Sequence, residues 1–212
     1  MTARIVTVAQ QKGGAGKTTL AITLAVAWAG QGKKVALLDI DPQGSVTAWG
    51  GLRQGVAGQA PLHLSAVSGW RTGTEIDRLK RDYELVIVDS PPHAETAARL
   101  AIRSADLVVV PVQLSPMDLW ATGATIELAR TEKRPIVMVL NRVAPRGHLG
   151  DTIRTLIEQK NLPMAANTLG NRQAFASAML AGQGVTEFEP GSPAAEEALA
   201  LALELERRLM RA

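Results

Sequence analysis

Continuous apolar runs, separated by helix-like stretches, constrain the fold of this chain more than any other feature. The strong runs are Arg4–Ala9, Lys34–Ile40, Glu84–Asp89, Asp106–Val112 and Pro135–Asn141, and a weaker one is Pro163–Leu169. Their apolar residues are consecutive rather than alternating, so both faces of each strand should be buried, as in a parallel sheet covered by helices. We therefore expect an α/β fold, a doubly wound, mostly parallel sheet with helices on both faces and right-handed crossovers.

Helical periodicity fills most of the chain between these runs. Helices are predicted at Lys17–Gly30, Gly73–Lys80, Glu95–Arg103, Asp118–Lys133, Asp151–Lys160, Arg172–Ala181 and Pro193–Arg211. Connections are short, and only the glycine-rich segment Gly50–Pro61 is expected to be a flexible excursion. Because no repeat or linker divides the chain, residues 1–212 are expected to form a single domain, and this length is sufficient to bury one sheet core.

Composition excludes several classes of protein. The chain has no cysteine, which excludes disulfides, thiolate zinc sites and cysteine-held iron–sulfur clusters.

The N-terminus lacks a charged-then-apolar signal segment, and no apolar stretch reaches the roughly 20 residues of a membrane span, so we expect a soluble, cytoplasmic protein. The net charge is +3, but Glu187–Ala212 holds six glutamates against three arginines, so the remainder is mildly basic. This excess is compatible with contact to an anionic polymer and equally with basic residues scattered over a solvated surface.

A glycine-rich run follows the first predicted strand and opens the first predicted helix. The glycines let backbone amides converge on phosphate oxygens, and the helix N-terminus adds the positive end of its dipole. We expect Lys17 to neutralise the β- and γ-phosphates of ATP, Thr18 to offer its hydroxyl to Mg²⁺, and Thr19 to lie near the α-phosphate. The run reads Gln11-Lys12-Gly13-Gly14-Ala15-Gly16-Lys17-Thr18-Thr19.

Carboxylates follow two of the other predicted strands. Asp39 and Asp41, spaced i and i+2, should point the same way at the strand end where open α/β sheets bind ligands. The run 85–88 is apolar and ends in Asp89, which is the Walker B pattern, so Asp89 is predicted to hold Mg²⁺ through water. The stiff turn 90–92 that follows is a candidate sensor of the γ-phosphate.

The glycine-rich run departs from the common P-loop pattern G-x-x-x-x-G-K-[ST]. Gln11 replaces the first glycine, and a second lysine, Lys12, precedes the double glycine. This string resembles the deviant Walker A motif of the ParA/MinD family, and the order of motifs and the short length resemble the small, ParF-like ParA partition ATPases. The resemblance implies that Lys12 crosses a homodimer to the partner's nucleotide, that Asp41 orients or activates the attacking water, and that Asp39 supports the magnesium and lysine network.

Three sets of site residues follow from the motifs and the resemblance, which covers nearly the whole chain and is weakest at Gly50–Gly69. Asn141 and Arg142 are included because they resemble the family's adenine-side position. The sets are Lys12, Lys17 and Asp41 for catalysis; Lys12, Gly13, Gly14, Ala15, Gly16, Lys17, Thr18, Thr19, Asn141 and Arg142 for the nucleotide; and Thr18, Asp39 and Asp89 for the metal.

The resemblance also implies a working cycle. ATP and Mg²⁺ would bring two subunits together with the nucleotide between them, and the dimer would bind non-specific DNA on the nucleoid. A cargo-bound activator of the ParB or ParG kind would stimulate hydrolysis to ADP and phosphate, and repeated cycles would segregate or position the cargo. The cargo is not named by the sequence: a plasmid, a chromosome region, a chemoreceptor cluster and a protein microcompartment are all open.

Basic residues that are candidates for DNA contact are scattered in the second half of the chain. Arg172 is favoured because it resembles a basic position in the family's C-terminal block. The full set is Arg142, Arg146, His148, Arg172, Arg207, Arg208 and Arg211. The three histidines, His63, His93 and His148, lack metal-ligand spacing and are interpreted as structural or surface residues.

Three other readings of the same motifs stay open. A MinD-like membrane ATPase would end in a basic amphipathic helix, whereas Pro193–Arg211 is rich in Ala, Leu and Glu and lacks Trp and Phe. A biosynthetic ligase, such as a dethiobiotin or cobyrinate synthase, would need a substrate site that the sequence does not reveal. A scaffold that binds ATP without hydrolysing it is disfavoured by the presence of Lys12 and Asp41.

Overall fold

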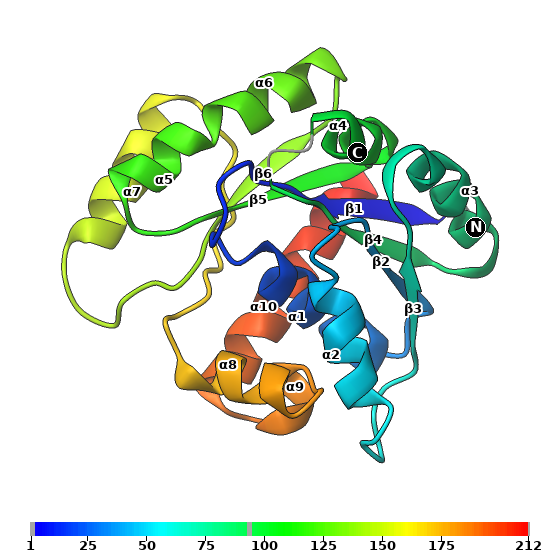
Figure 1. Cartoon of the computed structure of the whole chain (residues 1–212). Helices are drawn as coiled ribbons and strands as arrows, with labels where there is room; N and C mark the ends of the chain where they lie inside the picture. The colour runs from blue at the N-terminus through cyan, green and yellow to red at the C-terminus, as the bar shows by residue number, and fades with distance from the viewer. Residues whose placement is uncertain (1–2, 93–94, 212) are drawn as a thin grey trace.

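The computed structural model describes residues 3–92 and 95–211 (Figure 1). Within them, six strands form one sheet in the order β3-β2-β4-β1-β5-β6, and every strand pairing is parallel. This confirms the predicted doubly wound α/β fold. The strands are β1 Arg4–Val8, β2 Val35–Asp39, β3 Leu62–Ala66, β4 Leu85–Asp89, β5 Leu107–Val112 and β6 Ile136–Leu140.

Helices cover both faces of the sheet, as predicted. One face carries α1 Lys17–Gly30, α2 Ser45–Arg53, α8 Gln173–Leu180, α9 Val185–Phe188 and α10 Pro193–Arg211. The other carries α3 Thr72–Asp82, α4 Glu95–Ser104, α5 Pro116–Ala121, α6 Gly123–Thr131 and α7 Leu149–Gln159, with a short 3₁₀ helix, η1 Gly69–Arg71, before α3. Across the described residues, no helix is long and apolar enough to cross a membrane.

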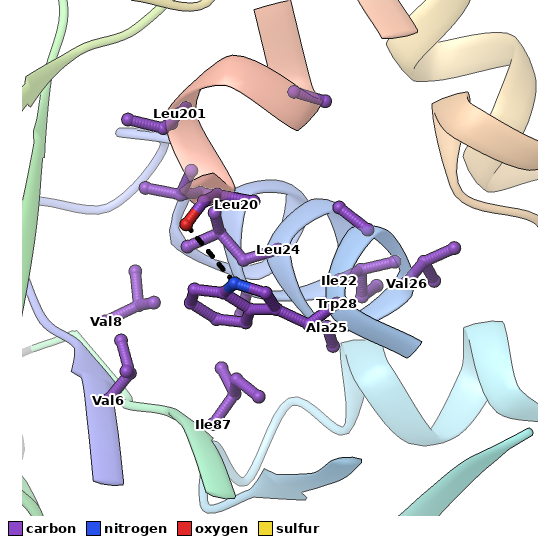
Figure 2. Close-up of a cluster of buried hydrophobic side chains, with 14 of the residues drawn as sticks. Val6, Val8, Leu20, Ile22, Leu24, Ala25, Val26, Trp28, Ile87 and Leu201 are labelled. Carbon is purple, nitrogen blue, oxygen red and sulfur yellow. Dashed lines mark hydrogen bonds between the residues drawn. The ribbon is translucent and has the colours of Figure 1, made fainter. Parts of the chain in front are cut away.

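The core fixes helix α1 between the sheet and α10. Successive strand residues point to opposite faces, so Val6 and Val8 of β1 pack toward α1 while Ile5 packs toward α3 and α4. The indole of Trp28 is fully buried and donates a 3.2 Å hydrogen bond to the carbonyl of Ala202 in α10 (Figure 2). Because α1 is apolar around most of its circumference, it is held from both sides, and the loop that precedes it has a rigid support.

The predicted strand at Pro163–Leu169 is wrong. Only isolated bridges form there, between Met138 and Met164 and between Val143 and Gly170. The Glu204 carboxylate of α10 accepts hydrogen bonds from the backbone amides of Ala166 and Asn167, each at 2.9 Å. These amides are therefore satisfied by a side chain, so the segment does not continue as a ladder beside β6.

The predicted single helix Asp118–Lys133 is also wrong, because it is two helices. The chain enters α5 two residues earlier, at Pro116, a residue that suits the first helical turn. Helix α5 ends at Ala121, where the hydroxyl of Thr122 donates to the carbonyl of Leu119 at 2.6 Å. A side-chain hydroxyl that bonds to the backbone in this way competes with helix propagation, and α6 then restarts at Gly123.

The predicted flexible excursion Gly50–Pro61 is wrong in its first part, because α2 continues to Arg53. Both α2 and the edge strand β3 were missed. The buried Arg53 guanidinium makes two 2.8 Å contacts with the Glu187 carboxylate and donates to the Ala60 carbonyl, also at 2.8 Å. These contacts anchor both ends of the loop between α2 and β3 to the α9 region.

Candidate functional site

The glycine-rich run forms a loop between β1 and α1. Gly14 and Gly16 have φ values of 78° and 88°, a left-handed region that favours glycine. A Cβ atom on Gly16 would also collide with the side chain of Asn141. The loop carbonyls are held from neighbouring strand ends: Asn141 Nδ2 donates to Ala15 at 3.0 Å, and Gln113 Nε2 donates to Gly14 at 2.6 Å. The loop shape is therefore fixed by side chains that follow β5 and β6.

The first turn of α1 offers an anion site. Its N-cap is Gly16, which supplies no side chain to the free amides of the first turn. Lys17 is buried, and burial lowers its pKa, while the nearby carboxylates of Asp89 and Asp41 act in the opposite direction. The hydrogen bond of its amine to the Lys12 carbonyl is long, at 3.5 Å. A buried ammonium beside free helix amides is suited to a phosphate group.

Asp39 and Asp89 lie in register on the neighbouring strands β2 and β4. The Thr18 hydroxyl donates to Asp89 Oδ2 at 2.7 Å, and Asp89 Oδ1 has no hydrogen-bond partner among the described residues. Burial raises the pKa of Asp89 to about 7, and the charges of Asp39 and Asp41 add to this rise, whereas Thr18 and Lys17 oppose it. An orphaned, buried carboxylate oxygen beside a hydroxyl fits Mg²⁺, whose preferred ligands are oxygens. Thr18 and Asp89 would hold it.

The Asp39 side chain supports the loop that follows β2. Its Oδ1 accepts the Asp41 amide at 3.0 Å, and its Oδ2 accepts the amide and hydroxyl of Thr47 at 3.1 and 3.2 Å. Asp41 is half-buried and closes its own turn by accepting the Gln43 amide at 2.9 Å. Asp39 therefore holds the start of α2 in place through Thr47. Asp41 uses its Oδ1 within its own turn, and its Oδ2 remains for other partners.

Lys12 of the glycine-rich loop is paired with a carboxylate of α5. Its Nζ lies 2.9 Å from Oδ1 of Asp118, a nearly buried carboxylate in the first turn of α5, while the Lys12 side chain is 40% exposed. Asp118 was not among the predicted site residues. An acid in a first helical turn is ordinary, and the sequence carries no signal that α5 meets the loop after β1.

A cavity of about 430 Å³ opens beside the start of α1. Its walls combine the predicted pair Asn141 and Arg142 with the apolar side chains of Leu169 and Phe175. Arg142 has a left-handed φ of 55°, and its amide donates to Asn141 Oδ1 at 3.0 Å. Apolar walls with a few polar groups suit a flat heterocyclic base. Phe175 was missed because its contact with this cavity depends on how α8 packs.

The comparisons with known proteins identify the family of this chain. A family model described as the CobQ/CobB/MinD/ParA nucleotide binding domain matches residues 6–185. The chain belongs to this family. It is a ParA/MinD-family P-loop ATPase.

Two relatives and one solved structure show the extent of the likeness. Maintenance of carboxysome distribution protein A of Halothiobacillus neapolitanus is 30% identical over 193 residues, 87% of each protein. The chromosome-partitioning ATPase Soj of Thermus thermophilus is 28% identical, with 99% of this chain and 98% of Soj covered. The septum site-determining protein MinD of Pyrococcus horikoshii, solved with Mg-ADP, is 18% identical with a TM-score of 0.79, covering 97% of each chain.

The basic candidates of this ATPase do not form one surface. Arg142 and Arg172 line the cavity at the carboxyl end of the sheet, and Arg172 is paired with Glu197 at 2.6 Å. Arg207, Arg208 and Arg211 line another cavity at the amino ends of β5 and β6. The sequence could not show this separation, because it depends on the direction of α10.

Other candidates have local roles or lie apart. Arg208 pairs with Glu204 at 2.9 Å and donates to the Met164 carbonyl at 2.8 Å. Arg146 and His148 are exposed on the segment before α7. His63 stacks on Tyr83 with ring centroids 5.0 Å apart, and burial lowers its pKa. His93 lies outside the described residues.

Asp89→Asn is expected to stabilise this ATPase in the absence of nucleotide while weakening its binding of Mg²⁺. The pKa of Asp89 is raised in the folded protein, so its carboxyl favours folding only while it is protonated. The wild-type protein therefore loses free energy of unfolding as the pH rises from the unfolded-state pKa of this group toward about 7. Asparagine does not titrate, so the melting temperature of Asp89→Asn should exceed that of wild type more at pH 8 than at pH 5. Each kcal/mol corresponds to roughly 2–4 °C in a domain of this size. A gap that is equal at both pH values would contradict the assigned burial effect.

Proposed function

We propose that this ATPase is an ATP-dependent dimerising switch that positions or segregates a cargo. The observation that carries the proposal is the contact of Lys12, whose ammonium lies 2.9 Å from Asp118 on α5 and whose side chain is partly exposed. A lysine placed there can leave the subunit and reach a nucleotide held by a second copy. We propose that residues 1–212 act as one nucleotide-binding domain in this cycle.

ATP hydrolysis to ADP and phosphate is assigned to the residues around the loop. Lys17 and the first-turn amides of α1 bind the phosphates, and the cavity beside Asn141 and Arg142 takes the base. Asp41 orients the attacking water, and Lys12 of the second copy completes the charge around the phosphates. When bound, Mg²⁺ supplies charge neutralisation to the phosphate oxygens, which is the main requirement of phosphoryl transfer.

The proposed partners are a second copy of the chain, non-specific DNA and a cargo-bound activator of the ParB or ParG kind. Exposed arginines in the described surface, such as Arg146 and Arg207, support contact with phosphates. A location in the cytoplasm on the nucleoid follows from this proposal. Leu201, Leu205 and Leu209 of α10 are buried, so one face of this helix packs on the core, and this supports DNA over a membrane as the bound surface.

Retention on DNA, measured against salt with ATP, ADP or no nucleotide, tests the proposal. We expect retention with ATP only, falling with salt by a slope of about 0.9 for each phosphate contact. DNA retention that is the same with ATP, with ADP and without nucleotide, or that is absent under all three conditions, would argue for a membrane ATPase or a biosynthetic ligase.

Two single variants that remove equal charge locate the DNA surface. Arg146→Ala alters the exposed segment that follows β6, and Arg211→Ala alters the cavity at the amino ends of β5 and β6. The variant that reduces the salt slope by about one identifies the contacting edge, and the other variant is its matched control. If neither variant changes the slope, both arginines are wrong as DNA contacts.

A further inference from the structure

We propose that Gln10, which lies between β1 and the glycine-rich loop, is a positioning residue that orders water around Mg²⁺. The inference rests on the Mg²⁺ site assigned above to Thr18 and Asp89, and it adds a residue that the sequence motifs did not include. Gln10 is 2% exposed, and neither its Nε2 nor its Oε1 has a hydrogen-bond partner among the residues that the structure describes. A buried amide without partners costs folding free energy, so another contribution must keep it there.

Gln10 lies beside the end of β4. The Ser90 amide, one residue beyond that strand, donates to the Val8 carbonyl at 3.3 Å. Val8 is paired with Asp89 in the sheet register, and Gln10 follows Val8 by two residues. The spacing of neighbouring strands and the rise per residue place the Cα atoms of Gln10 and Asp89 about 8 Å apart. An extended glutamine side chain spans roughly 5 Å of such a distance.

The alternation of side chains along β1 assigns Gln10 to the face of the sheet that carries α1. Val8 packs toward α1, and Ala9 packs toward the opposite face with residues of α5 and α6. Gln10 is the next residue. Asp89 is on the α1 face, because it accepts the hydroxyl of Thr18 at 2.7 Å. Its other oxygen, Oδ1, is also buried without a partner in the described part of the chain.

The two unpaired groups fit one ordered water. A buried water needs two to four polar partners, and it can accept a hydrogen bond from Gln10 Nε2 while it donates one to Asp89 Oδ1. Water of this kind accompanies Mg²⁺, which keeps several of its waters when one or two carboxylates bind it. The amide of Gln10 therefore gains its partners when metal and nucleotide occupy the site.

Two other amides near the loop have a different role. Asn141 and Gln113 already donate to the carbonyls of Ala15 and Gly14, so they fix the loop without nucleotide. Gln10 makes no such contact with any residue in the described ranges. Its contribution should therefore depend on whether the metal site is occupied.

Gln10→Met tests this role, because methionine has a similar length and no strong hydrogen-bonding group. Without nucleotide, the variant should melt about 2–4 °C above wild type, since the unpaired amide is gone. The Mg²⁺ concentration that half-saturates binding of a fluorescent ADP analogue should rise about 10–100-fold, the usual effect of losing a group that orients a metal's ligands. Binding of the analogue in EDTA should not change.

Thr125→Val is the matched control. The Thr125 hydroxyl is also buried without a partner among the described residues, but it belongs to α6, outside the loop and the strand ends that form the site. Its removal should not change the Mg²⁺ requirement. An increase as large as that of Gln10→Met would show that loss of any unpaired polar atom has this effect, and it would contradict the role of Gln10.

The outcomes separate this inference from the metal site on which it rests. If nucleotide binding by wild type does not depend on Mg²⁺, the site at Thr18 and Asp89 is wrong, and Gln10 loses its role with it. If wild type depends on Mg²⁺ and Gln10→Met has the same requirement, Gln10 alone is wrong. A Gln10→Met protein that fails to fold, or that melts below wild type without nucleotide, would show that the amide already has partners and would overturn the proposal.

A double variant supplies a readout that a purely structural role would not change. If Gln10 and Asp89 share one water, Gln10→Met should raise the Mg²⁺ requirement much less in an Asp89→Asn background than in wild type. Equal increases in the two backgrounds would show that the residues act independently, and they would contradict the shared water.

Discussion

Lys17→Ala is expected to abolish binding of ATP. Lys17 is buried at the first position of α1, directly after the left-handed Gly16, and its ammonium lies within the electrostatic reach of Asp41 and Asp89. Alanine keeps the helix but removes the cation that meets the phosphates. Charge-assisted hydrogen bonds are roughly twice as strong as neutral ones, and the loss of two corresponds to an affinity at least about 100-fold lower.

Calorimetric titration of ATP with Mg²⁺ measures this loss, and Lys33→Ala is the matched control. Lys33 also pairs with a carboxylate, Glu206 at 2.7 Å, but the pair lies at the amino end of the sheet, away from the glycine-rich loop. Its substitution should leave ATP affinity unchanged. If Lys17→Ala bound ATP within a few-fold of wild type, the phosphate role of Lys17 would be wrong.

The sequence was sufficient for the fold class because the central strands are continuous apolar runs. Strands such as Leu85–Asp89 and Leu107–Val112 are buried along their whole length, and this pattern occurs in sheets covered on both faces. The edge strand Leu62–Ala66 was missed because it is only half-buried, and His63 and Ser65 interrupt its apolar pattern. Its position beside β2 is determined by tertiary packing, which the apolar pattern within one β-strand does not reveal.

The site residues show the same difference between local patterns, which the sequence records, and tertiary contacts, which it does not. Residues whose placement depends on local geometry, such as Gly16 and Lys17, were predicted because the loop and the start of the helix are contiguous in the sequence. Contacts that join distant segments were not. Gln113 reaches Gly14 across 99 residues, and Asp118 contacts Lys12 from helix α5. Lys12 itself lies in the loop after β1, and Asp118 lies in α5 after β5, so both contacts depend on β1 and β5 being neighbours in the sheet, a strand order that local patterns leave open.

Asp41→Ala is expected to keep ATP binding, to lower the turnover rate by about 10²–10⁴-fold and to trap an ATP-bound dimer on DNA. Asp41 stands in the turn after β2, and its carboxylate contacts the Gln43 amide rather than the glycine-rich loop. Its removal therefore leaves Lys17 and the free amides of α1 in place. The dimer forms, but the attacking water loses the carboxylate proposed to orient it, so the step that separates the subunits is blocked.

Light scattering with ATP and Mg²⁺ and phosphate release in the same sample test this prediction together. Asp77→Ala is the control, because Asp77 is an exposed carboxylate on α3 paired with Lys80 at 3.7 Å, and its loss should change neither readout. An Asp41→Ala protein that binds ATP yet stays monomeric would refute the dimer. A dimer that still releases phosphate at the wild-type rate would instead keep the switch and remove Asp41 from the chemistry, which would leave Lys12 of the second copy as the group that couples dimerisation to hydrolysis.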